Sequence, residues 1–108
     1  MYKLFCFSYY LLVKIMFTLK DALWFVNEMG IELNEFSIKD LLVGMNIELE
    51  HGLVSPETNV SNDDLIITGK IALAHLREYP NYYNEEYGLP AMERDLERRL
   101  KEKNTYLE

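Results

Sequence analysis

Helix-start signals constrain the fold of this chain more than any other feature of its sequence. Each signal is a hydroxyl residue followed three positions later by an aspartate, which is the spacing of a capping box. Two of them occur, Thr18 with Asp21 and Ser37 with Asp40. Gly30 and Gly52 follow at positions where a helix can end. The pattern predicts one helix over residues 19–29 and a second from residue 38 to about residue 50 or 51.

The second half of the chain predicts two more helices. Ser61 or Asn62 can cap a third helix over residues 63–79, and Pro80 ends it because the residue before a proline disfavours helical backbone. Pro90 suits the first turn of a last helix that runs to about residue 103. We therefore expect an all-α fold, a small bundle of three main helices plus a C-terminal helix.

Composition divides the chain into residues 1–15, 16–89 and 90–108. The first part has an apolar run of about a dozen residues, which is too short to span a bilayer. It also lacks the small-residue cleavage site of a secretory signal. We expect Met16 to be the natural start and the preceding segment to lie outside the core. A membrane-associated role is the alternative if the segment is retained and inserted.

Apolar residues at helical spacing predict which faces are buried. In the first helix they are Leu19, Leu23, Trp24, Phe25 and Val26. The third helix carries two stripes, Leu65, Ala72 and Leu76 in one and Ile67, Ile71 and Ala74 in the other. It should be buried on much of its circumference. The last helix has only a narrow stripe, Met92, Leu96 and Leu100. We expect it to be solvated and docked by one thin edge, with self-association along that edge as the alternative.

Negative charge is concentrated in the body of the chain. The formal net charge is -7, and residues 16–89 hold thirteen acidic and four basic side chains. Such a surface repels phosphate backbones, so nucleic-acid binding is disfavoured. It suits a cation or a basic protein partner. The plainer explanation is that the excess acid keeps the protein soluble.

The only cysteine is Cys6, so neither an intrachain disulfide nor a cysteine-based zinc site can form. A reducing, cytoplasmic setting is the simplest inference. The serines of the body, Ser37, Ser55 and Ser61, fall at predicted helix caps or in the loop. No glycine-rich phosphate loop or nucleotide motif occurs. The sequence therefore shows no nucleophile system, and enzymatic activity stays open.

Both histidines have a carboxylate three positions away. Glu48 precedes His51, and Glu78 follows His75. Residues three apart share one face of a helix, so two helices can each present an imidazole and a carboxylate to a common point. Helical bundles hold iron, manganese or zinc with such ligands. These four residues are the candidate site for a divalent metal, which could activate water for hydrolysis.

Five further residues are candidates for binding around this site. Glu50 or Asp64 would lie near a metal, although Asp64 in the first turn of the third helix is equally explained by the helix dipole. Thr68 lies on the same edge of that helix as His75. Tyr82 and Tyr83 belong to a tyrosine-rich segment that either packs over the helix ends or recognises a ligand.

A structural role for the histidines is the stronger hypothesis. The helix dipole favours His51 at a helix C-terminus. His75 can hydrogen-bond to a buried carboxylate such as Glu48 and so lock two helices together. Buried polar pairs of this kind fix the packing register and do no chemistry.

Three blocks of the sequence resemble a family of small bacterial, archaeal and phage proteins catalogued only as a domain of unknown function. They read GMNIELEHG from Gly44, TNVSNDD from Thr58 and TGKIALAHLREYPNYY from Thr68. The chain departs from the usual pattern at Leu65, where proline is usual, and at Gly69, where alanine is usual. Residues 85–90 also look divergent. The resemblance implies no activity.

These features support three classes of function. The first is an interaction or accessory module with a structural His/Glu cluster. The second is a metal-binding protein, with metal-dependent hydrolysis as its extension. The third is a small acidic inhibitor or nucleic-acid mimic, which would need carboxylates on one continuous face. Partner and oligomeric state are left open.

Overall fold

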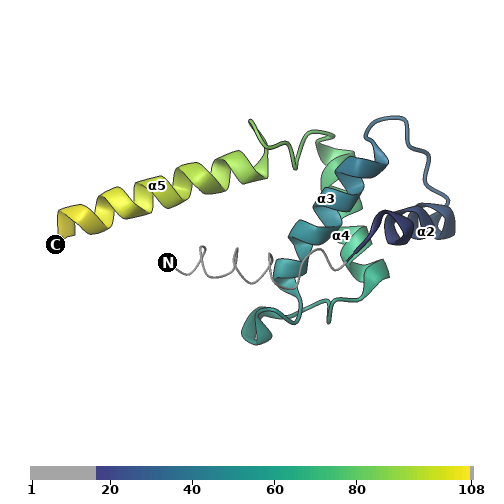
Figure 1. Cartoon of the computed structure of the whole chain (residues 1–108), viewed down its shortest axis with the longest axis horizontal. Coiled ribbons are helices and arrows are strands. Elements are labelled where there is room, and N and C mark those ends of the chain that lie inside the picture. The colour runs from purple at the N-terminus through teal and green to yellow at the C-terminus, as the bar shows by residue number, and fades with distance from the viewer. Residues whose placement is uncertain (1–16, 108) are drawn as a thin grey trace.

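The computed structural model describes the backbone of residues 17–107 and the side chains up to residue 104 of the 108-residue chain. Residues 1–15, with the predicted apolar extension, lie outside this part. The described chain is all-α and has no strand (Figure 1). Its α-helices are α2 (Leu19–Met29), α3 (Ile38–Glu48), α4 (Leu65–Glu78) and α5 (Leu89–Leu107). Two short 3-10 helices, η1 (Leu49–His51) and η2 (Pro56–Thr58), lie between α3 and α4. The predicted fold class is confirmed.

The first two helices begin at the predicted capping boxes. Thr18 Oγ1 accepts a hydrogen bond from the Asp21 amide at 3.3 Å, and the Asp21 carboxylate accepts one from the Thr18 amide at 2.9 Å. Ser37 and Asp40 repeat this exchange at 3.0 and 2.9 Å. Gly30 ends α2 in the left-handed conformation, with φ 65°. Reciprocal capping thus sets where α2 and α3 start.

Helix α4 starts later than the sequence predicted, because its N-cap is Asp64 and not Ser61 or Asn62. The Asp64 carboxylate accepts a hydrogen bond from the Ile67 amide at 2.9 Å. Asn62 and Asp63 have φ of 53° and 61°, a left-handed backbone that cannot continue into a right-handed helix. The side chain of Asn62 instead receives a hydrogen bond from Asn59 at 2.7 Å. The loop therefore continues two residues further than its polar composition indicated.

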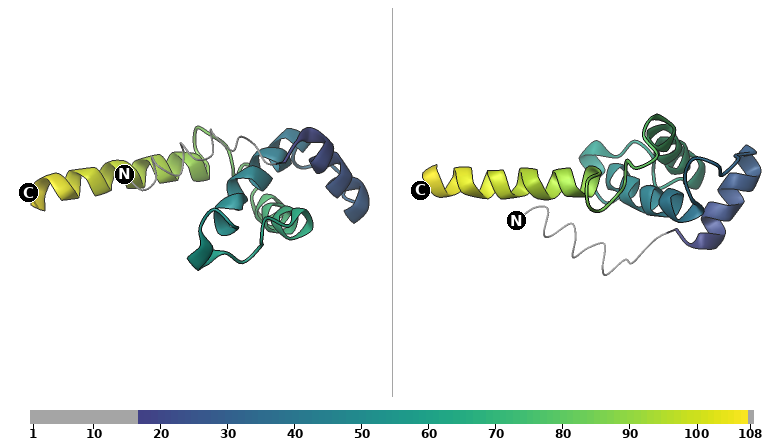
Figure 2. Two further views of the ribbon diagram at one scale, coloured as in Figure 1. Left: turned by 60° about the horizontal axis from the view of Figure 1, so that its bottom comes forward. Right: turned by 90° about the horizontal axis from the view of Figure 1, so that it is seen from above.

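The core lies between α3 and α4, with α2 packed across both (Figures 1 and 2). Its buried hydrophobic members are Phe17, Ala22, Phe25, Leu41, Met45, Leu49, Ala72, Leu73, Leu76 and Tyr83. Phe17 is fixed to α3, since its amide donates to Asn46 Oδ1 at 3.0 Å and Asn46 Nδ2 donates to its carbonyl at 3.1 Å.

Two of the predicted apolar faces are less buried than expected. Leu19, Leu23 and Trp24 on α2 are each about half exposed. Of the second stripe of α4, Ile67 and Ala74 are exposed, whereas Ile71 is half-buried. The predicted burial of α4 on much of its circumference is nevertheless confirmed, because its exposed residues lie along one side and the rest are buried or half-buried.

Helix α5 projects away from the other helices (Figures 1 and 2). Its apolar stripe, Met92, Leu96 and Leu100, is 53–59 % exposed. The expected docking by this edge is therefore absent from the described structure. The first half of the helix is tied to the body, where the Leu89 amide donates to the Tyr82 carbonyl at 2.7 Å and the Arg94 guanidinium donates to the Glu85 carbonyl. None of the described helices has the length and apolar character needed to cross a bilayer.

Candidate functional site

Glu48 is the centre of the candidate site and is only 2 % exposed. It is the last residue of α3, on the face that carries Leu41, Gly44 and Met45 into the core. The amphipathic pattern of α3 therefore places a carboxylate where an apolar residue would ordinarily sit. A buried carboxylate is costly unless other groups hydrogen-bond to it, so its partners decide what the site can do.

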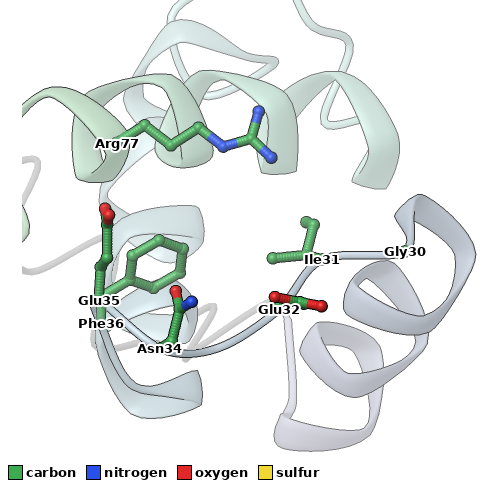
Figure 3. A pocket seen from close by; sticks show the side chains of 7 residues that line it. All are labelled: Gly30, Ile31, Glu32, Asn34, Glu35, Phe36 and Arg77. Carbon is green, nitrogen blue, oxygen red and sulfur yellow. The ribbon is translucent and has the colours of Figure 1, made fainter.

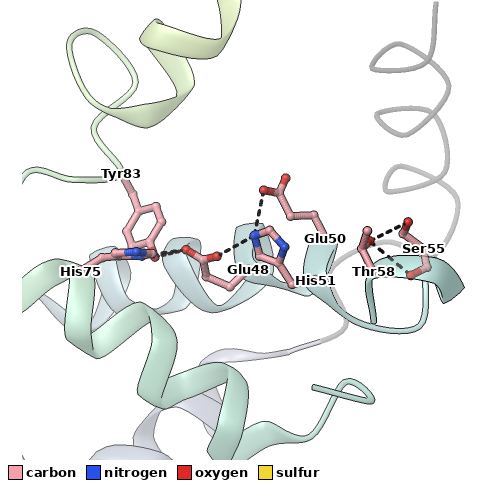
Figure 4. Close-up of polar contacts among 7 residues, drawn as sticks. All are labelled: Glu48, Glu50, His51, Ser55, Thr58, His75 and Tyr83. Atoms are coloured by element: carbon pink, nitrogen blue, oxygen red, sulfur yellow. Dashed lines mark hydrogen bonds and ion pairs between the residues drawn. The ribbon is translucent and has the colours of Figure 1, made fainter. Parts of the chain in front are cut away.

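Two side chains meet at one oxygen of this carboxylate (Figure 4). His75 Nδ1, from α4, lies 2.9 Å from Glu48 Oε2. The Tyr83 hydroxyl, from the segment after α4, lies 2.5 Å from the same oxygen and 2.9 Å from His75 Nδ1. The three groups form a closed triangle, which we call the Glu48–His75–Tyr83 cluster.

The protons of this cluster can be placed from its geometry. The hydroxyl of Tyr83 donates to Glu48 Oε2, which leaves the phenol oxygen as an acceptor. Nδ1 of His75 lies within hydrogen-bond distance of Glu48 Oε2 and of the Tyr83 hydroxyl oxygen, and with a proton on Nδ1 it can donate to them. The other ring nitrogen, Nε2, is then the basic one. The cluster therefore favours this tautomer of His75.

The ring of Tyr83 reaches Glu48 because Gly44 leaves room for it. A Cβ at Gly44 would overlap the Tyr83 ring. Gly44 lies one helical turn before Glu48 on the same face of α3. The close contact at this glycine is therefore with an aromatic ring from the segment after α4. A glycine inside the helix was the available sequence signal for a close contact at this turn, but it did not identify Tyr83 as the residue that makes it.

Tyr82 completes the aromatic surroundings of His75. The two rings stack with their centroids 4.2 Å apart and 9° between their planes. Burial and the hydrogen bond to Glu48 raise the pKa of the Tyr83 phenol far above its usual value. Burial, followed by the charge of Glu48, also raises the pKa of Tyr82. Both phenols therefore stay protonated in neutral solution, and Tyr83 remains a donor.

His51 faces the opposite oxygen of the buried carboxylate. Its Nε2 lies 3.6 Å from Glu48 Oε1 and 3.4 Å from Glu50 Oε1 (Figure 4). The side chain of His51 is 48 % exposed, so this contact lies at the edge of the cluster. Glu48 thus joins the two histidines of the chain through its two oxygens. Of the four residues predicted to converge, Glu48, His51 and His75 do so, and Glu78 makes none of these contacts.

The remaining candidate residues lie elsewhere. Glu78 is exposed at the end of α4 and takes no part in the ion pairs of the cluster. Asp64 caps α4 at its start, fourteen positions before Glu78. Thr68 is fully buried in the core, and its hydroxyl has no hydrogen-bond partner among the described residues. Of the five predicted binding residues, Tyr83 belongs to the cluster, and Glu50 and Tyr82 lie beside it.

The described side chains contain no group of three or more His, Cys, Asp or Glu residues arranged to hold a metal ion. Tyr83 and His75 both occupy Glu48 Oε2, and a phenol donating a hydrogen bond is not a metal ligand. The metal site of Glu48, His51, His75 and Glu78 stays a prediction.

A pocket of about 440 Å³ opens on a different side, beside the connection between α2 and α3 (Figure 3). Arg77 extends over it from α4, while Ile31 and Phe36 supply apolar surface. The carboxylates of Glu32 and Glu35 stand at its edge. Because the pocket is open and carries two acids and one base, it suits a small basic or zwitterionic group. No sequence motif indicated it.

Fold and site together define a small all-α domain built around an internally bonded glutamate–histidine–tyrosine cluster. The chain belongs to the family described as "Protein of unknown function (DUF5661)", whose model matches residues 22–95. This confirms the resemblance to a family of unknown function, and residues 85–90, expected to diverge, lie inside the matched range. No curated protein and no solved structure matches the chain.

Proposed function

We propose that the domain is a cytoplasmic interaction or accessory module in which the Glu48–His75–Tyr83 cluster has a structural role. One observation carries this: the buried Glu48 carboxylate has both oxygens facing side chains of the same domain. The cluster links the end of α3 to α4 and to the segment that leads into α5. A polar network that is satisfied internally rigidifies a core and leaves binding to the surface.

A basic protein partner fits that surface best. Residues 17–89 carry thirteen acidic and four basic side chains. The pocket beside α2 and α3 combines the carboxylates of Glu32 and Glu35 with the ring of Phe36. A lysine or arginine side chain has an apolar stem for the ring and a charge for the carboxylates. Arg77 leaves the pocket with a formal charge of -1, so the attraction is moderate and should weaken with salt.

A matched pair of variants tests this proposal. Glu32→Gln/Glu35→Gln removes the two carboxylates of the pocket, and Glu85→Gln/Glu86→Gln removes two exposed carboxylates after α4. Both variants have the same net charge. In affinity capture from the host cells, a partner should be retained by the wild type and by the Glu85/Glu86 variant and lost by the Glu32/Glu35 variant. Equal retention by all three proteins, or equal loss by both variants, would argue against the proposal.

Metal binding is the second candidate, and the tautomer of His75 favours it. A carboxylate that accepts from Nδ1 leaves Nε2 as the basic nitrogen, which is how metal-binding histidines are held. His51 Nε2 also lies between two carboxylate oxygens at 3.4 and 3.6 Å. A bound divalent ion would polarise water, which is the basis for proposing hydrolysis. Glu50 and His51 would have to reorient to bind an ion together with Glu48.

Metal content separates the two candidates. The purified protein should contain no stoichiometric iron, manganese or zinc, and its melting temperature should not respond to chelator or to added divalent ions. Under the second candidate, one ion per chain would be present and would be lost in His51→Ala and His75→Ala. Chelator would then lower the melting temperature of the wild type to that of the variants.

A further inference from the structure

We propose that the domain forms an antiparallel homodimer through α5. This inference is independent of the proposed function, because it uses none of the residues that form the cluster or line the pocket. It starts from a helix of 19 residues that projects from the body and carries an exposed apolar stripe (Figure 1). The stripe consists of Met92, Leu96 and Leu100, four positions apart, which keeps it on one side of the helix.

The sequence of α5 shows which surface fits this stripe. Its charges change sign symmetrically about Arg98. Glu97 and Arg99 stand one position from that centre, Asp95 and Lys101 three positions, Arg94 and Glu102 four, and Glu93 and Lys103 five. In all four pairs the two charges are opposite. At two positions from the centre, both residues are leucine, Leu96 and Leu100.

This symmetry is what an antiparallel pair of identical helices requires. With the two-fold axis at Arg98, each residue lies at the level of the residue equally far from the centre on the other side. Leu96 then meets the partner's Leu100, and Glu93 lies at the level of the partner's Lys103. A symmetric interface repeats every such relation twice. In a parallel pair the same levels would bring like charges together, so the charges select the antiparallel arrangement.

Arg98 itself does not oppose the pairing. It is two positions from both Leu96 and Leu100, which places it on the far side of the helix from the stripe. Its guanidinium donates to Asp95 and to Glu102 within the same helix, both at 2.7 Å. The positive charge at the centre is therefore directed away from the partner and is neutralised locally.

Charge also indicates that the surface which covers the apolar stripe is a second α5 and not the body of a second copy. The first half of the helix has a net charge of -2 from Glu93, Arg94, Asp95 and Glu97, and the second half has a net charge of +2 from Arg99, Lys101, Glu102 and Lys103. The body, with thirteen acidic and four basic side chains, is acidic on balance and would attract the basic half. A second α5 in the reverse direction complements both halves, so the occupant that satisfies the whole helix is a second copy of this chain.

Sedimentation equilibrium of the full chain over a range of concentrations tests the dimer. The wild type should approach twice the mass of one chain as the concentration rises. Leu96→Gln should weaken dimerisation by about tenfold or more, since the apolar contact is lost twice. Leu53→Gln is the matched control, because Leu53 is 56 % exposed and Leu96 is 55 % exposed. A wild type that stays monomeric, or equal weakening by both substitutions, would overturn the proposal.

Charge variants test the complementarity. Glu93→Lys/Glu97→Lys makes both halves of α5 basic, and Lys101→Glu/Lys103→Glu makes both halves acidic. Each variant alone should be monomeric, and an equimolar mixture should form heterodimers. Because the altered side chains lie on α5 outside the core, the circular dichroism of the body should not change. Failure of the mixture to associate, or undiminished homodimers of either variant, would contradict pairing through α5.

Disulfide trapping tests the direction, with Cys6 replaced by serine so that only introduced thiols pair. The introduced thiols are Met92→Cys and Lys103→Cys. Along the helix axis, position 92 of one chain and position 103 of the other are within about 1.5 Å of the same level in an antiparallel pair and about 16 Å apart in a parallel pair. Mild oxidation of a mixture should join residue 92 of one chain to residue 103 of the other. Preferential joining of 92 to 92 and 103 to 103 would show a parallel pair and overturn the inference.

Discussion

The hydroxyl oxygen of Tyr83 lies 2.5 Å from Oε2 of Glu48, although the two residues are 35 positions apart. This hydrogen bond lies at the end of α3 and ties the segment before α5 to the bundle. It also offsets part of the free-energy cost of burying the Glu48 carboxylate. The stability of the domain should therefore depend on a single phenol proton more than on any surface ion pair.

Tyr83→Phe tests that dependence. The substitution keeps the ring against Gly44 and removes only the donor to a buried carboxylate. We expect the free energy of unfolding in urea to fall by about 1.5–3 kcal/mol, the usual range for a hydrogen bond to a charged group. Tyr82→Phe is the control, because it keeps the stack on His75 and removes a hydroxyl that takes no part in the hydrogen bonds of the cluster. It should change stability by less than about 0.5 kcal/mol.

Alkaline pH should destabilise the domain, because the phenol of Tyr83 loses its proton more readily in the unfolded chain than in the folded one. Burial and the bond to Glu48 raise the pKa of Tyr83 in the folded state, whereas the unfolded phenol titrates near pH 10. Above that pH the unfolded chain binds fewer protons, so stability is complete below it and declines as pH rises. Tyr83 should contribute about 1.4 kcal/mol per pH unit to this decline. Urea unfolding between pH 8 and 11 should show a shallower decline for Tyr83→Phe. Parallel curves for the two proteins would contradict the assignment.

Gly44→Ala should be destabilising even though alanine is the better helix former. The substitution gains about 1 kcal/mol of helix propensity. It also places a methyl group against the Tyr83 ring, and such overpacking typically costs about 1–3 kcal/mol. In a Tyr83→Ala background the ring is gone, and Gly44→Ala should become stabilising. A double-mutant cycle measured by urea unfolding checks this change of sign. The same effect of Gly44→Ala in both backgrounds would mean that the ring does not fill this space.

The local part of the fold was predictable from the sequence, because capping is a short-range interaction. Thr18, Asp21, Ser37 and Asp40 located the starts of α2 and α3 to the residue. The start of α4 was not predictable in this way. Several polar residues before it can all cap, and only the left-handed backbone at Asn62 and Asp63 excludes the earlier ones. Backbone conformation in a loop depends on tertiary contacts such as the 3.0 Å bond from the Leu53 amide to Asp63 Oδ1.

The site was predictable only in part, for a related reason. Helical spacing placed Glu48 and His51 on one face. Glu48 was also the carboxylate expected to hydrogen-bond to His75. The same spacing argument chose Glu78, which is exposed, because periodicity describes one helix and not its rotation against the next. The position of Tyr83 depends on how the chain turns after Pro80. No local rule fixes that path, and the four tyrosines of the region were not distinguishable by sequence.

Thr68 offers the opposite case to Tyr83, a buried hydroxyl without a partner. Its Oγ1 is fully buried and makes no hydrogen bond among the described residues. Thr68→Val replaces the hydroxyl with a methyl group of similar shape and should raise the free energy of unfolding by about 1 kcal/mol, since an unsatisfied polar group is removed. Thr68→Ser keeps the hydroxyl and removes the methyl group, so it should lower stability by about 1 kcal/mol. Thermal and urea unfolding of both variants checks the pair. A less stable Thr68→Val would mean that the hydroxyl has a partner in solution, which is what a binding role for Thr68 requires.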